Sequence, residues 1–256
     1  MFLDANNRPL GNSHIKMINH RGFNEVAPEN TLPAYKLSVQ KGFKYVECDV
    51  DFTSDGYAVL IHDDTVDRTS NGTGSIRSLT FAQVRSLDFG SWKSTKYVGT
   101  RIPTFEEFIL LCKKLGLCPY IEIKSTITAE NAKTLIDIVK RYDMLKHSTW
   151  ISFGSSNLEY IKAEHPSARL GLCISSASTS YITWASSQTT DENEVFLDMR
   201  YASVTSAFVE SCITAGVSLE VWTVNTDVDF KSLDPYISGV TTDSLRAYAP
   251  LYYEFE

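Results

Sequence analysis

The sequence predicts an α/β fold, a (β/α)8 TIM barrel with a small insertion after the second strand. Apolar stretches of strand length alternate with stretches of helix length, and eight such strand-helix units can be counted from Ile15 onward. The 256 residues suit one large α/β domain or two small ones, and the regular alternation favours a single domain over 1–256. Polar and charged residues stand where the early strands end, which is where ligands bind in parallel α/β proteins.

The first unit is a strand over Ile15–Asn19 and a helix over Thr31–Lys41. The loop between them carries His20-Arg21-Gly22, so an imidazole and a cation stand at the end of the strand. Asn30 and Thr31 are predicted to cap the helix, because both residue types satisfy free backbone N–H groups at helix starts. Gly22 removes a side chain beside the charged pair and lets another group approach closely.

The second strand, Tyr45–Val50, leads into a segment of different character, 52–101. We expect it to contain a short strand at Tyr57–Ile61, a Gly-rich stretch near 67–75 and a helical piece near Leu79–Leu87. A segment of this size holds a poor core by itself. It is therefore predicted to be a small inserted subdomain within the barrel domain.

The remaining units follow in order. Thr104 is predicted to cap the helix that resumes the barrel and runs to Leu115. The later strands are predicted at Pro119–Lys124, Thr149–Phe153, Leu170–Ile174, Glu194–Met199, Ser218–Val224 and Gly239–Thr241. The helices between and after them are predicted at Thr128–Tyr142, Ser156–Ala163, Thr179–Ser187, Thr205–Ala215, Val228–Leu233 and Leu245–Tyr252.

Composition excludes several classes of protein. The formal net charge of -7 argues against nucleic acid as the main partner. No apolar run is long enough to span a bilayer, so stable membrane insertion is not expected. The stretch 1–13 lacks a signal-peptide core, which predicts a cytoplasmic protein, or a secreted or periplasmic one if a signal peptide has been removed. The five cysteines include no C-x-x-C pair and are predicted to be buried free thiols rather than zinc ligands.

Three carboxylates gather at the strand ends. Side chains alternate along a strand, so Glu47 and Asp49 point to one side while Cys48 points to the other. Glu122 stands near the end of the next barrel strand. An all-oxygen set of this kind suits Mg²⁺ or Ca²⁺ better than zinc. The alternative is that these are polar positions on an edge strand, but a closed barrel has no edges, and inward carboxylates need a partner.

His20 and His62 each follow an apolar strand, and each is followed by a charged residue. A lone histidine is more often structural than catalytic. Two histidines flanking a metal, however, can act as general acid and general base, because the imidazole pKa lies near neutrality.

Arg21 and Lys124 are suited to an anionic substrate, and an arginine fits a pair of phosphate oxygens especially well. Lys124 could instead reach past the strand end into solvent, which we consider less favoured because Glu122 lies two positions before it. Trp222 ends a late strand, and the sequence favours equally a place in the core and a place in an apolar pocket wall.

Taken in series, the motifs resemble the glycerophosphodiester phosphodiesterase family. They are H-R-G with P-E-N-T, E-x-D on the next strand, D-G followed by H-D, R-T with a Gly-rich turn, R-I-P-T-F-E-E and I-E-I-K. Each is weak alone, but together they run in order from about Ile18 to Lys124. Beyond this the match thins to W-T-V-N at Trp222 and T-D at Thr242-Asp243. Cys48 departs from the usual aliphatic residue.

The resemblance implies hydrolysis of glycerophosphodiesters to sn-glycerol 3-phosphate and an alcohol on a TIM barrel. It implies one divalent cation, Mg²⁺ or Ca²⁺, held by Glu47, Asp49 and Glu122. His20 and His62 would be the acid-base pair, and Arg21 and Lys124 would contact the phosphate of a small-molecule substrate. Trp222 could pack against the glycerol carbons, and Glu29 could hydrogen-bond near the metal.

The sequence leaves several alternatives open. The metal, the leaving alcohol, the oligomeric state and the assignment of acid and base to the two histidines cannot be read from it. Attack by a glycerol hydroxyl, giving a cyclic phosphate, and direct attack by water remain alternatives. A phospholipase-type enzyme acting on inositol or sphingo-lipids is a second candidate, and a non-catalytic phosphodiester-binding protein is a third.

Overall fold

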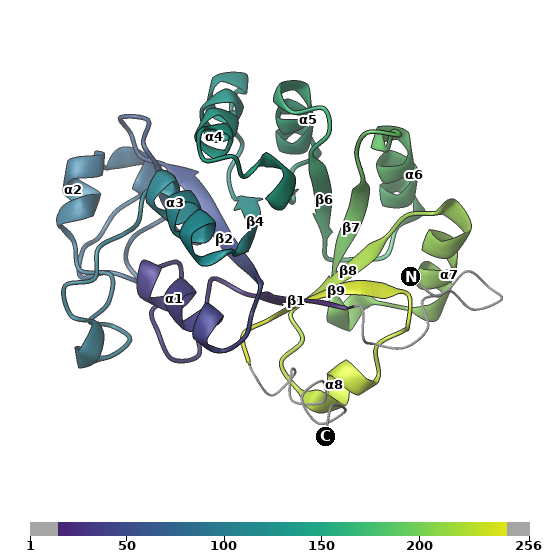
Figure 1. Ribbon diagram of the computed structural model, residues 1–256, viewed down its shortest axis with the longest axis horizontal. Coiled ribbons are helices and arrows are strands. Elements are labelled where there is room, and N and C mark those ends of the chain that lie inside the picture. Colours follow the sequence, from purple (N-terminus) through teal and green to yellow (C-terminus); the bar gives the residue numbers. More distant parts are fainter. Residues whose placement is uncertain (1–14, 245–256) are drawn as a thin grey trace.

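The computed structural model of the chain describes residues 15–244, which form a closed parallel barrel surrounded by helices (Figure 1). Each barrel strand pairs in parallel with the next, and β1 closes the ring by pairing with both β2 and β9. This confirms the predicted TIM barrel. Its strands are β1 (Lys16–Asn19), β2 (Tyr45–Phe52), β4 (Cys118–Ile123), β5 (Thr149–Ser152), β6 (Arg169–Ile174), β7 (Val195–Arg200), β8 (Leu219–Trp222) and β9 (Ile237–Thr242).

The helices lie outside the ring and follow the strands in alternation. They are α1 (Leu32–Gln40), α3 (Phe105–Leu115), α4 (Ala129–Arg141), α5 (Ser155–Glu164), α6 (Thr179–Gln188), α7 (Ser206–Ala215) and α8 (Asp227–Lys231), with 3-10 turns η3 (Leu145–His147) and η4 (Tyr201–Ser203). The predicted bounds agree to within one or two residues at most ends. The helix predicted at Leu245–Tyr252 lies outside the described residues.

Side-chain capping explains where several helices begin. The Thr104 hydroxyl accepts the backbone N–H of Glu107, whose carboxylate accepts the N–H of Thr104, a reciprocal capping box. The cap of α1 differs from the prediction. Thr31 occupies the N-cap position, but its hydroxyl donates to the Pro28 carbonyl oxygen and accepts no N–H group of the helix. Asn30 points elsewhere and takes part in the site described below.

The segment 52–101 contains β3 (Ala58–Leu60), η1 (Ile76–Ser78), α2 (Phe81–Ser86) and η2 (Thr95–Tyr97). The strand β3 pairs antiparallel with the end of β2 and so lies beside the ring rather than within it. Several of its apolar side chains, together with Ile102 just after it, form a cluster of their own, separate from the barrel core: Val59, Ile61, Val66, Ile76, Val84 and Phe89. Its description as an inserted subdomain stays a prediction.

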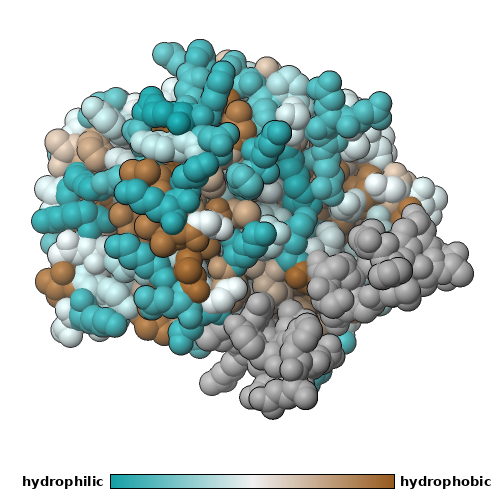
Figure 2. All heavy atoms as spheres, in the orientation of Figure 1, coloured by the Kyte–Doolittle hydropathy of each residue, from teal (hydrophilic) through white to brown (hydrophobic). Residues whose placement is uncertain are grey.

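The apolar core has two layers. The larger one lies between the ring and the helices, where Cys48 and Trp150 are fully buried. The smaller one fills the inside of the ring, with Ile18, Tyr120, Ile151, Cys173 and Phe196. On the face drawn in Figure 2, hydrophilic side chains predominate and hydrophobic ones appear in smaller groups between them. No helix among the described residues is long and apolar enough to cross a membrane.

Charged groups close the inside of the ring at the end where the strands begin. The buried Glu220 carboxylate accepts hydrogen bonds from Arg169 at 3.1 Å, from the Tyr120 hydroxyl at 3.2 Å and from Lys16 at 3.2 Å. A Cβ atom at Gly239 would lie 2.5 Å from the Glu220 carboxyl carbon, so a larger residue there would have to displace this carboxylate. The polar groups of the predicted site lie at the opposite end of the ring, where the strands end.

Candidate active site

A cavity of about 250 Å³ opens at the ends of the barrel strands. Seven of the eight predicted site residues line it, and the eighth, Asp49, lies buried directly behind it. The residues that line the cavity are His20, Arg21, Glu47, His62, Glu122, Lys124, Ile151, Phe153, Cys173, Asp198, Trp222, Thr223 and Thr241. Residues from both ends of the sequence thus meet at one mouth, as the closed ring requires.

Glu47, Asp49 and Glu122 form a compact acidic cluster. Each offers an oxygen atom, and these oxygens lie within 4.8 Å of one another. The pairing of β2 with β4 explains the grouping, because Asp49 and Glu122 stand opposite each other in the ladder and Glu47 lies two residues before Asp49 on the same face. Their exposures are only 2%, 0% and 9%, respectively. Three buried carboxylates this close need compensating positive charge.

Protein groups satisfy this cluster only in part. Glu47 Oε1 and Asp49 Oδ1 are buried and accept no hydrogen bond within the described part of the chain. Burial, with the charges of Asp49 and Glu122, raises the pKa of Glu47 well above its usual range. Burial and the charge of Asp49 also raise the pKa of Glu122. Unpartnered, hard oxygen donors in this state fit a divalent cation such as Mg²⁺ or Ca²⁺.

Arg21 and Lys124 supply the positive charge that the protein does bring to the cluster. Lys124 Nζ lies 2.8 Å from Glu122 Oε1 and 3.7 Å from Asp49 Oδ1. Arg21 Nε lies 3.2 Å from Asp49 Oδ2. Although burial opposes ionisation, the charges of Arg21, then His62 and Lys124, lower the pKa of Asp49. Both cations therefore stand beside the acidic cluster and line the cavity, where an anionic group could reach them.

The backbone between β1 and α1 is shaped around the cluster. Arg21 and Asn30 both have left-handed backbone conformations, with φ of 53° and 55°, which non-glycine residues rarely adopt. In this conformation the Arg21 N–H donates to Glu47 Oε2 at 2.8 Å. The Asn30 side-chain amide donates to Asp49 Oδ2 at 2.7 Å. Asn30 was predicted to cap α1, and that prediction was wrong, because its side chain instead orients an acidic residue of the cluster.

The strand ends also present His20, which is held by a carboxylate that the sequence analysis did not assign. His20 Nδ1 lies 2.6 Å from Asp243 Oδ1, just beyond the end of β9. The amides of Asn24 and Asn225 donate to the same carboxylate, at 2.6 and 2.9 Å. Although burial opposes ionisation, these bonds and the His20 ring keep the pKa of Asp243 below its usual range. With Nδ1 engaged, His20 Nε2 is the ring nitrogen left for other contacts.

His62 is held in a similar way by its own neighbour. His62 Nδ1 lies 2.7 Å from Asp63 Oδ1, and the Arg68 guanidinium donates to both oxygens of Asp63 at 2.6 and 2.9 Å. The Arg68 hydrogen bonds hold the pKa of Asp63 below its usual range. Arg68 also binds both oxygens of Glu29, and Glu29 accepts Arg21 at 3.0 Å. Within residues 15–244, Glu29 therefore pairs with two arginines and forms no hydrogen bond or ion pair with the acidic cluster.

Aromatic rings form another wall of the cavity. Trp222 and Phe153 meet edge to face, with ring centroids 5.6 Å apart, and the indole N–H of Trp222 donates to the Asp198 carbonyl oxygen at 3.0 Å. The Lys124 ammonium lies 6.0 Å from the Phe153 ring centroid. Of the two places considered for Trp222, the structure favours the pocket wall, because the ring is partly exposed and lines the cavity.

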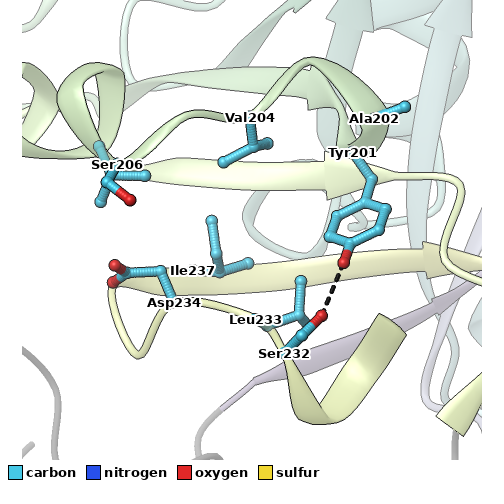
Figure 3. A pocket seen from close by; sticks show the side chains of 9 residues that line it. Tyr201, Ala202, Val204, Ser206, Ser232, Leu233, Asp234 and Ile237 are labelled. Atoms are coloured by element: carbon cyan, nitrogen blue, oxygen red, sulfur yellow. Dashed lines mark hydrogen bonds between the residues drawn. The ribbon is translucent and has the colours of Figure 1, made fainter. Parts of the chain in front are cut away.

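A second cavity, of about 380 Å³, lies outside the ring between the segment that follows β7 and the segment that joins α8 to β9 (Figure 3). The Tyr201 hydroxyl and Ser232 Oγ meet across it at 2.7 Å. Of the described residues that line it, Asp234 alone is charged. None of the predicted site residues lies there, so the chemistry-bearing groups belong to the first cavity.

Two functional candidates, Arg68 and Asp243, belong to the R-T and T-D motifs of the resemblance, but the sequence analysis gave neither of them a role. Asp243 follows the last strand, and a closed ring brings that strand against the first one, so the predicted topology contained the signal that it lies beside His20. Arg68 sits in the segment 52–101 between polar residues, and no periodic pattern distinguishes it. The paired acidic residue Asp63 was visible next to His62, but its role was not.

Comparison with known proteins gives consistent results. The model of the glycerophosphoryl diester phosphodiesterase family matches residues 20–247. A glycerophosphodiester phosphodiesterase of Caldanaerobacter subterraneus is 32% identical over 230 residues, which are 89% of this chain and 93% of that protein. One of Bacillus subtilis is 27% identical over 250 residues, covering 91% and 85%. A solved phosphodiesterase of Oleispira antarctica, in complex with the product sn-glycerol-3-phosphate, is 26% identical with a TM-score of 0.84, covering 93% and 96%.

Proposed function

The chain belongs to the glycerophosphoryl diester phosphodiesterase family and is an enzyme of that class. We propose that it hydrolyses glycerophosphodiesters to sn-glycerol 3-phosphate and an alcohol, using one divalent cation and the histidine pair His20 and His62. The product named for the Oleispira antarctica structure supports the identity of the released phosphate.

The observation that carries the proposal is the acidic cluster, which meets two carboxylate-held histidines at one cavity. Glu47, Asp49 and Glu122 would hold the cation, because they offer converging oxygens of which two are buried without a hydrogen bond. A cation there would supply positive charge to a phosphate oxygen and lower the pKa of a nearby hydroxyl. The buried site and the charge of Arg21 and Lys124 would exclude a neutral ligand in favour of an anionic one.

The two histidines would carry the protons. Because Asp243 and Asp63 each accept from Nδ1, the neutral rings hold their proton there and present Nε2 as a base. When protonated, the same nitrogen can donate. One histidine would accept the proton of the attacking oxygen, and the other would protonate the leaving alkoxide, which is a poor leaving group without that proton.

Arg21 and Lys124 would bind the phosphate, and the aromatic wall would hold the carbon chain. Both cations line the cavity next to the cluster, so a phosphodiester could contact them while one oxygen faces Glu47, Asp49 and Glu122. Trp222 offers an apolar face of suitable size for the glycerol carbons. These roles match the requirements of phosphoryl transfer, in which positioning and charge neutralisation lower the barrier.

The proposal is tested by measuring sn-glycerol 3-phosphate release from glycerophosphocholine, glycerophosphoethanolamine and glycerophosphoinositol. We expect kcat to fall by about 100- to 10,000-fold in His20→Ala and His62→Ala, because this is the usual contribution of a general acid or base. We expect a loss in the same range for Glu47→Ala, which removes a ligand of the cation. His147→Ala is the matched control, because His147 is exposed on η3 and lies outside the cavity.

Chelation of divalent cations should abolish the activity, and adding back Mg²⁺ or Ca²⁺ should restore it in the wild type but not in Glu47→Ala. Retained activity in chelator, or in both His20→Ala and Glu47→Ala, would overturn the proposal. Faster hydrolysis of intact inositol phospholipids or sphingolipids than of the soluble diesters would favour the phospholipase-type alternative.

A further inference from the structure

The loop 90–101 combines exposed apolar side chains with unpaired positive charge. Its sequence G-S-W-K-S-T-K-Y-V-G-T-R contains Lys93, Lys96 and Arg101 and no acidic residue. Val98 is 64% exposed and Trp92 is 38% exposed, and both belong to the few large hydrophobic side chains that face solvent. The loop follows α2, at the left edge of Figure 1.

Asp88 partly offsets one of the three positive charges of this loop, that of Arg101: backbone N–H bonds, first that of Gly99, and the charge of Arg101 lower the pKa of its carboxyl group. Among residues 15–244, neither Lys93 nor Lys96 forms an ion pair, and each ammonium lies instead over a neighbouring aromatic ring, at 5.7 Å from that of Trp92 and 5.5 Å from that of Tyr97. Asp88, which precedes the loop, accepts the backbone N–H groups of Gly90, Ser91 and Gly99. That carboxylate therefore holds the loop's shape.

The loop is rigidly attached at its base. The Phe89 N–H donates to the Thr100 carbonyl oxygen at 2.8 Å, and the indole N–H of Trp92 donates to the Phe89 carbonyl oxygen at 3.0 Å. The Arg101 guanidinium donates to the backbone oxygens of Ser86 and Leu87. Because this loop is already fixed, its apolar side chains lose little conformational entropy when they meet a partner, and the free-energy cost of binding is lower.

The residues that flank the loop adjoin part of the candidate active site. Phe89 shares a small cavity with Glu29, Asn30 and His62. Tyr97 belongs to one buried cluster with Ala27 and Ala34, in the segment that connects β1 to α1 and in α1 itself. The loop is therefore attached next to the segments that carry Glu29, Asn30 and His62.

From these observations we propose that the loop 90–101 docks the enzyme reversibly on the surface of an anionic phospholipid bilayer. Tryptophan and lysine together are typical of segments that lie at a lipid-water interface, where the ring enters the headgroup region and the ammonium meets lipid phosphates. The whole chain carries a net charge of -7, so a general electrostatic attraction to such a surface is absent. Attraction to the anionic bilayer must therefore come from the positive charges of this loop.

Co-sedimentation of the full chain with vesicles tests this proposal. Binding is expected to vesicles of phosphatidylcholine mixed with phosphatidylglycerol at low salt, to weaken in high NaCl, and to be absent with phosphatidylcholine alone. The double variant Lys93→Gln, Lys96→Gln should lower the partition coefficient by roughly 30-fold, since each lysine near an anionic surface contributes about fivefold.

The matched control is Lys114→Gln, Lys146→Gln. It removes the same charge from exposed lysines in α3 and η3, near the opposite end of the strands, and should bind like the wild type. Val98→Asp is a second test variant, because it adds a charge at an exposed site and removes no buried group. It should weaken binding at least as strongly as the loss of one lysine.

Several outcomes would overturn the proposal: no binding by the wild type, equal binding to neutral vesicles, or equal loss in the control variant. Unchanged binding of Val98→Asp would do so as well, since the apolar tip would then be irrelevant. Binding of heparin by the loop 90–101 as tight as its binding of vesicles would also overturn the proposal, because it would indicate a general polyanion site. Hydrolysis of soluble glycerophosphocholine should be unchanged in every one of these variants, so a failure here is distinct from a failure of the proposed function.

Discussion

Removal of the Asp243 carboxylate should slow hydrolysis through His20 and leave the fold in place. His20 Nδ1 and Asp243 Oδ1 are 2.6 Å apart, and their side chains are 19% and 32% exposed. At that exposure a hydrogen bond to a charged partner contributes about 1.5–3 kcal/mol. If this bond stabilises the imidazolium that forms as His20 accepts a proton, Asp243→Ala should lower kcat by roughly 10- to 150-fold.

Asp243→Asn should have a smaller effect, for a reason visible in the hydrogen bonds. Asn24 and His20 both meet Oδ1, whereas Asn225 donates to Oδ2. The amide oxygen of Asn225 already accepts the Asp243 backbone N–H, so its NH₂ group stays turned toward this carboxylate. An asparagine at 243 whose amide oxygen faces His20 and Asn24 keeps both of these hydrogen bonds and loses only the one from Asn225, because its NH₂ group then faces another NH₂ group. The charge is lost, but the orientation of the ring is partly kept.

The assay is the steady-state release of sn-glycerol 3-phosphate from glycerophosphocholine, with kcat and KM determined for each variant. Asp227→Ala serves as the control, because that carboxylate is exposed on α8 and, among residues 15–244, its one ion pair is with Lys231. The decisive comparison is the double variant His20→Ala, Asp243→Ala. If Asp243 acts through His20, it should be no slower than His20→Ala alone. Additive losses, or wild-type kcat in Asp243→Ala, would refute the reasoning.

Three further predictions concern the metal cluster, the core and the response to acid. Glu122→Gln should raise the Mg²⁺ concentration for half-maximal activity by roughly 10- to 100-fold or more, because removing even a residue that only hydrogen-bonds a metal ligand lowers metal affinity by that factor. A titration of activity against Mg²⁺ measures it. Phe108→Ala should cost about 3–5 kcal/mol of unfolding free energy in urea, since the ring is fully buried 4.5 Å from that of Tyr35. Although burial opposes ionisation, Arg68 and then Arg21 hold the pKa of Glu29 below its usual 4.5. Its contribution to stability is therefore present above that value and lost as pH falls through the folded-state pKa, so Glu29→Gln should lose less unfolding free energy on acidification than the wild type.

Much of the fold was predictable because each unit carries its own local signals. Threonines that satisfy helix N–H groups mark the starts of α3 and α4, and alternating apolar residues mark the strands. The ring follows from the count of units. The antiparallel pairing of β3 with β2 was not predictable, because it depends on how the segment 52–101 folds back rather than on any periodicity.

The site was predictable as far as residues share a strand or adjoin one. Glu47 and Asp49 were recognised from their spacing, and their meeting with Glu122 follows from the register of β2 and β4. Asn30 was misassigned because its amide can cap a helix or bind a carboxylate, and only the left-handed backbone turns it toward Asp49. Asp243 lies 223 residues from His20, so its role appears only when the ring closes.

Anomalous diffraction from crystals of the chain soaked in Mn²⁺ tests the central claim most directly. The account predicts one strong peak among the carboxylates of Glu47, Asp49 and Glu122, and its loss in Glu47→Gln crystals of the same form. A peak at another place, or none in crystals of an enzyme whose hydrolysis Mn²⁺ supports, would contradict it.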